Sequence, residues 1–140
     1  MRKHPDRLAS MGITPERYRE LQDMCRQYPE HVRKIRRVRA GIVDRPTRKG
    51  GGWKRPDPTG NAAVNIAVEV EWMEARVKMI DNCVKLAAPA AIAKAVLKSV
   101  TEGRRYEDLS PPCGMNQFYD ARLWFYVILD RSMKSAVKFQ

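Results

Sequence analysis

An all-α fold, with a C-terminal helix-turn-helix-like module and a basic N-terminal segment, is predicted by three features of the sequence. Apolar residues recur at intervals of three and four over most of the chain, as one face of an α-helix requires. No segment shows the strict alternation typical of a half-buried strand, and proline or glycine marks the ends of the periodic segments. The 140 residues suit a single modest core.

The first helices are expected within residues 1–43, the basic helical N-terminal segment. Thr14 is suited to cap a helix, and Pro15 fits its first position because the N–H that proline lacks would be unpaired there. Pro29 should end or break this helix. Val32, Ile35 and Val38 then form a narrow apolar stripe, which indicates that a helix resumes over residues 30–40.

Residues 44–60 are predicted to be a basic linker rich in glycine and proline. Apolar periodicity is lost there, while Pro46, Pro56, Pro58 and the run Gly50–Gly52 favour irregular chain. Asp57 or Thr59 could cap the helix that follows.

Residues 61–140 are predicted to form the helical core, which contains the helix-turn-helix-like module. The periodic segments and their breakers place helices at Asn61–Ala87, at Ala90–Val100 with Gly103 as terminator, at Tyr106–Leu109 for one turn, and from Met115 to about Lys134. The core is expected to contain Ile66, Val70, Met73, Val77, Val96, Phe118, Phe125 and Ile128.

A formal net charge of +11 favours polyanionic partners, and DNA, RNA and acidic proteins all qualify. Among these, double-stranded DNA is the expected partner. The charge is uneven, because residues 1–60 carry 16 basic and 7 acidic side chains. Phosphate contacts are expected from the segment 33–55 and from the turn after Gly103. For the helix face of residues 30–39, a solvated basic surface is the competing interpretation. The candidates are Arg33, Lys34, Arg36, Arg37, Arg39, Arg45, Arg48, Lys49, Lys54, Arg55, Arg104 and Arg105.

Base-reading contacts are expected at the start of the last helix, since a recognition helix presents polar side chains of its first turns to the major groove. Asn116, Gln117, Tyr119 and Arg122 supply such groups, although ordinary exposed residues would give the same pattern.

No catalytic constellation emerges, so a non-catalytic protein without cofactor or metal is expected. His4 and His31 lie far apart without ligands at metal-site spacing, and the three cysteines suit neither a disulfide framework nor a zinc site. No apolar run approaches the length of a membrane span. Free thiols and the absence of an export signal favour the cytoplasm.

Residues 57–135 resemble small phage-encoded transcription regulators of the late-gene-activator type, whose C-terminal halves look like region 4 of bacterial sigma factors. The resemblance rests on the Asp57-Pro58-Thr59 helix start, on the turn Thr101-Glu102-Gly103 with Tyr106–Leu109, and on the segment 113–122, which is similar to uncharacterised prophage proteins. It implies a DNA-binding transcriptional regulator of a phage or prophage that acts in a bacterial host cell.

Two other functions fit the same features. A small terminase-like DNA-packaging subunit would also combine long helices with a helix-turn-helix, and would form a ring of eight or more copies. An inhibitor that binds a host nucleic-acid enzyme would direct its basic face to a protein. Host transcription machinery or another host protein therefore remains an alternative partner, and self-association of the chain is left open.

Overall fold

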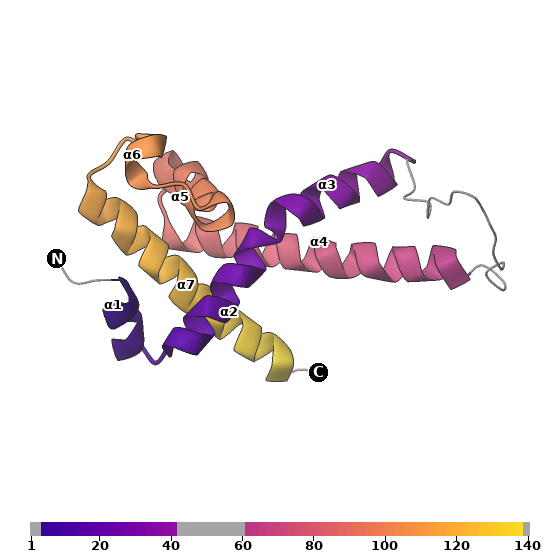
Figure 1. Cartoon of the computed structure of the whole chain (residues 1–140), viewed down its shortest axis with the longest axis horizontal. Coiled ribbons are helices and arrows are strands. Elements are labelled where there is room, and N and C mark those ends of the chain that lie inside the picture. The colour runs from indigo at the N-terminus through magenta and orange to yellow at the C-terminus, as the bar shows by residue number, and fades with distance from the viewer. Residues whose placement is uncertain (1–3, 42–60, 139–140) are drawn as a thin grey trace.

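The described part of the protein is all-helical, as predicted. A computed structural model describes residues 4–41 and 61–138, and no strand occurs within these ranges. The helices are α1 (His4–Ser10), α2 (Pro15–Arg26), α3 (Tyr28–Arg39), α4 (Asn61–Ala87), α5 (Ala90–Glu102), α6 (Tyr106–Leu109) and α7 (Met115–Lys138), as Figure 1 shows. The predicted linker 44–60, with its candidate caps, lies outside the described residues.

Local capping chemistry explains several helix ends. The Thr14 hydroxyl accepts a hydrogen bond from the Arg17 backbone N–H at 3.1 Å, which confirms the predicted start of α2. Gly103 ends α5 in the left-handed conformation, with φ of +75°. Pro29 lies in the first turn of α3 and not at its boundary, so the break between α2 and α3 falls at Gln27.

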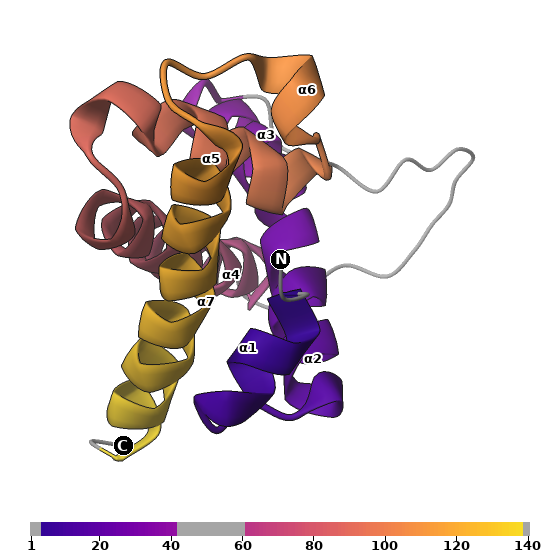
Figure 2. The same ribbon diagram turned by 90° about the vertical axis from the view of Figure 1, so that its left-hand side faces the viewer.

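The buried core includes the N-terminal helices, which the sequence prediction had left outside it. Leu8 of α1 and Leu21 and Cys25 of α2 are at most 1% exposed and pack into one cluster with side chains of α4, α5 and α7. Figure 2 shows α1 and α2 side by side against α7. Of the predicted core residues, Val70, Met73, Val96, Phe118 and Phe125 are buried, whereas Ile66, Val77 and Ile128 are half-buried.

Ion pairs to α7 hold α1 and α2 in place. Arg7 donates to Asp120 at 2.5 Å, and the Arg17 Nε donates to Asp130 at 2.6 Å. The Asp130 side chain is only 6% exposed and also pairs with Lys134 at 3.0 Å. A nearly buried carboxylate therefore has two cationic partners, as its desolvation requires.

Helices α3 and α4 form an arm that projects from the rest of the molecule (Figure 1). Along this arm the His31 ring meets the Trp72 ring edge to face, with centroids 5.5 Å apart. His31 is 9% exposed, and burial together with the neighbouring Arg76 lowers its pKa, so the imidazole is neutral at pH 7. A neutral imidazole thus lies between the two helices of the arm, beside the ion pairs that also join them.

Candidate nucleic-acid interface

Three basic residues of α3 pair with carboxylates of the described residues. Lys34 pairs with Glu69 of α4 at 3.1 Å, Arg39 pairs with Glu74 of α4, and Arg33 lies 3.5 Å from Glu30 within its own helix. Such exposed pairs contribute at most about 1 kcal/mol each, so a phosphate can replace the carboxylate at little cost.

Arg36 is exposed and differs from these residues because it has no ion pair among the described residues. It lies on a ridge between two grooves, since it lines one groove with α4 and another with α5. Arg37 is also exposed, and it lines a third hollow together with Glu30, His31 and Met73.

The groove between α3 and α5, which we call the basic groove, combines an apolar floor with a cationic rim. Its volume is about 370 Å³, and Pro29, Val32 and Leu97 contribute to the floor. Its charged lining consists of Arg33, Arg36, Lys94, Lys98 and Glu102. The single carboxylate accepts a hydrogen bond from Arg104 at 2.8 Å, so the rim as a whole remains strongly positive.

Lys94 and Lys98 were not among the residues predicted to bind nucleic acid. They lie one turn apart on the exposed face of α5, and neither has an ion pair within the described part of the chain. Their spacing of four was visible in the sequence and places both on one helix face. That this face meets α3 depends on tertiary packing, which the local pattern does not contain.

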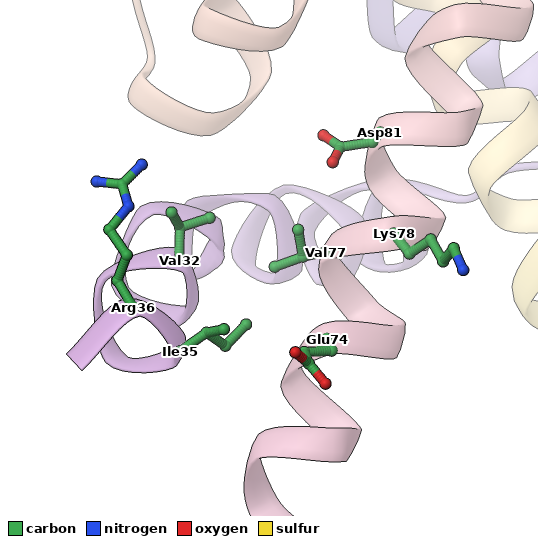
Figure 3. A pocket seen from close by; sticks show the side chains of 7 residues that line it. All are labelled: Val32, Ile35, Arg36, Glu74, Val77, Lys78 and Asp81. Carbon is green, nitrogen blue, oxygen red and sulfur yellow. The ribbon is translucent and has the colours of Figure 1, made fainter. Parts of the chain in front are cut away.

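The groove on the other side of α3, against α4, is electrostatically balanced (Figure 3). Val32, Ile35 and Val77 line a volume of about 530 Å³ together with the bases Arg36 and Lys78 and the acids Glu74 and Asp81. Asp81 also accepts a hydrogen bond of 2.6 Å from the Tyr28 hydroxyl, and burial and this carboxylate raise the pKa of Tyr28. Equal numbers of opposite charges make this groove a poorer site for a polyanion than the basic groove.

The four base-reading candidates at the start of α7 separate into exposed and packed side chains. Asn116 and Gln117 are exposed. The Tyr119 ring packs against Phe118 at 5.1 Å, and its hydroxyl accepts a hydrogen bond from the Tyr106 N–H at 3.5 Å.

Arg122 lies farther along α7 and faces inward. Its Nε is buried without a hydrogen-bond partner, and its guanidinium lies 5.8 Å from the centre of the Tyr126 ring. Asn116 and Gln117 are therefore the members of the predicted set that the structure leaves accessible to a partner.

The remaining phosphate candidates are dispersed. Arg104 donates a hydrogen bond to Glu102. Arg105, in the turn that leads into α6, lies 3.7 Å from Asp108. Arg45, Arg48, Lys49, Lys54 and Arg55 lie outside the described residues. The predicted order of helix, one-turn helix, turn and helix is observed in α5, α6 and α7, but α6 buries none of its side chains fully, and a helix-turn-helix geometry stays a prediction.

Two cysteines of the core are poor nucleophiles. Burial raises the pKa of Cys25 to about 12 and also raises the pKa of Cys83, whose thiol contacts the Ser132 hydroxyl at 3.6 Å. Within residues 4–41 and 61–138 there is no group of three or more metal-ligating side chains. No helix in these ranges has both the length and the apolar character needed to cross a membrane.

Comparison with protein-family models, with curated proteins and with solved structures gives no match to this chain.

Proposed function

We propose that the protein is a non-catalytic DNA-binding regulator that holds the phosphate backbone in the basic groove between α3 and α5. One observation carries the proposal: two helices distant in sequence bring Arg33, Arg36, Lys94 and Lys98 to one concave surface. Cationic side chains on a concave surface focus the electrostatic field and attract a polyanion. The regulatory role, as in phage or prophage transcription regulators, rests on the resemblance of residues 57–135.

The apolar floor of the groove suits backbone contact rather than binding of a free ion. Arginine and lysine stems can lie along Val32 and Leu97 while their charged ends reach outward to successive phosphates. Phosphate contacts of this kind position a protein on the duplex and are independent of base sequence. Sequence preference would then come from a separate element, for which the exposed Asn116 and Gln117 are the candidates.

Replacing Arg36, Lys94 and Lys98 by glutamine is expected to weaken binding to all duplexes alike. The loss of three phosphate contacts should reduce the slope of log K against log salt by roughly 3 units, because each contact releases condensed counterions. Fluorescence anisotropy of a labelled random duplex over a salt series measures this slope.

The matched control removes the same charge elsewhere. Arg19, Lys85 and Arg131 are exposed and have no ion pair in the described part of the chain, and none of them lines the basic groove. Their triple glutamine variant should keep the slope within about 1 unit of the wild type. An equal reduction in both triple variants would show that net charge alone governs binding and would exclude the groove as the site.

Base reading by α7 is tested separately with Asn116→Ala and Gln117→Ala. Each should lower the preference for a cognate site, selected from random duplexes, by about 1 to 3 kcal/mol, while affinity for unrelated duplexes stays nearly constant. Competition binding with cognate and unrelated duplexes measures the difference. If the selection enriches no sequence, or if both variants keep the full preference, α7 does not read bases.

A further inference from the structure

Helix α4 carries a second apolar face in addition to the one it buries. Val68, Trp72 and Leu86 are 60%, 48% and 73% exposed, although large apolar side chains on a helix normally face the core. The buried side of the same helix contains Val70, Met73, Ile80 and Val84, each at most 7% exposed. The fold thus uses one side of α4 for the core and leaves most of the other side exposed.

The exposed face follows a heptad pattern. Its successive members are separated by 4, 3, 4, 3 and 4 residues, which is the alternation of core positions in a coiled coil. These positions, which we call the α4 seam, are Val68, Trp72, Ala75, Met79, Asn82 and Leu86. Met79 is half-buried and the other members are exposed. A single polar residue at such a seam, here Asn82, is typical of coiled coils that fix their register.

Most of the α4 seam is accessible, and neighbouring side chains contact its tryptophan. The Val77 side chain points toward α3 in Figure 3, whereas Lys78, which flanks the seam, points away from it. Within the seam, Trp72 lies at the border with α3, since its ring meets that of His31. The Trp72 ring is fixed by His31 at 5.5 Å and by the guanidinium of Arg76, 4.7 Å from its centre. A prearranged tryptophan loses little conformational freedom when a partner covers it.

The size of the seam residues suits a second copy of α4 running antiparallel. In an antiparallel coiled coil about a two-fold axis between residues 73 and 74, Trp72 faces the partner's Ala75, and Val68 faces the partner's Met79. The largest side chain thus meets the smallest. The next layer pairs Asn65 with the partner's Asn82, so two exposed amides can hydrogen-bond each other.

The charges beside the seam are complementary in the same arrangement. Glu71 lies beside the partner's Lys78 on one flank, and Glu69 lies beside the partner's Arg76 on the other. Because of the two-fold axis, each of these charge pairs occurs twice in the dimer. Glu71 and Lys78 are exposed and have no ion pair within the described part of the chain, whereas Glu69 already forms an ion pair with Lys34 of its own chain. In a parallel arrangement Trp72 would face its own copy, and Lys78 would lose its carboxylate partner.

We propose that the protein forms a homodimer through an antiparallel coiled coil of the α4 seams. The dimer covers Val68, Trp72 and Ala75 of each chain and is separate from the basic groove, so it can exist whether or not the chain binds nucleic acid.

The oligomeric state of the full chain tests the dimer. Sedimentation equilibrium at high micromolar concentration should give twice the 16.1 kDa mass of one chain. Ala75→Arg places a long charged side chain opposite Trp72 and should return the protein to the monomer. Ala67→Arg, on the same helix and also exposed but outside the seam, should remain a dimer. A monomeric wild type, a larger assembly, or a dimer that tolerates Ala75→Arg would each overturn the proposal.

Charge reversal tests the antiparallel orientation. Glu71→Lys alone and Lys78→Glu alone each place like charges opposite each other and should weaken self-association at low salt. An equimolar mixture of the two variants should form a heterodimer. In it, residue 71 of each chain again faces a residue 78 of opposite charge in the other chain. If the mixture associates no better than either variant alone, the helices do not pair in this register. Far-UV circular dichroism confirms that every variant keeps its helical content.

Discussion

Replacing Phe125 by alanine is expected to lower the free energy of unfolding by about 3 to 5 kcal/mol, because the side chain is fully buried and leaves a cavity. Its ring packs 5.1 Å from that of Tyr126, within the cluster that joins α7 to the N-terminal helices. Domains of this size are stable by only about 5 to 15 kcal/mol. Urea denaturation followed by circular dichroism measures the loss.

The adjacent residue on α7 is the control. Trp124 is 42% exposed, so Trp124→Ala removes a large ring from the same helix with little change in the buried core and should cost about 1 kcal/mol or less. If Phe125→Ala does not fold, Phe125→Leu keeps most of the buried volume and should give a measurable, smaller loss. Equal costs at the two positions would contradict the burial assigned to Phe125.

The helices were predictable wherever local chemistry sets them. The bounds of α4 follow from its long apolar period, and those of α5 and α6 follow from Gly103 and the prolines after Leu109. Helix α1 was not predicted, because seven residues hold too few apolar positions to show a helical period. Its place in the core is a matter of tertiary contact through Leu8.

The candidate interface was predictable only in part, for a similar reason. The charge of α3 is a property of consecutive residues and was recognised, but the groove also needs Lys94 and Lys98 from α5. The α4 seam was hidden for another reason. Helix α4 is apolar on two sides, so the periodic signal of the buried face and that of the exposed face overlap in the sequence.

The ion pair between Arg17 and Asp130 is the second contact with a large expected effect. Arg17→Met should destabilise the protein by about 2 kcal/mol, less than the 3 to 5 kcal/mol typical of breaking a buried pair, because Lys134 still neutralises part of the charge. Asp130→Leu should cost less than Arg17→Met, since Arg17 keeps its ion pair with Glu20, 3.0 Å away, and no buried charge is left unpaired. Thermal and urea denaturation of both variants measure the two costs.

The double variant and the pH dependence separate this pair from simple packing. Asp130→Leu added to Arg17→Met should recover part of the lost stability, because no carboxylate is then left buried.

Burial raises the pKa of Asp130, but the hydrogen bonds from Arg17 and Lys134 outweigh this effect, and the pKa lies below its ordinary value. The stabilisation by this carboxylate is therefore complete above about pH 4 and is lost as the pH falls through the lowered pKa of the folded state. The difference in stability between the wild type and Arg17→Met should shrink over that acidic range, and a difference that stays constant down to pH 2 would show that Arg17 acts through packing alone.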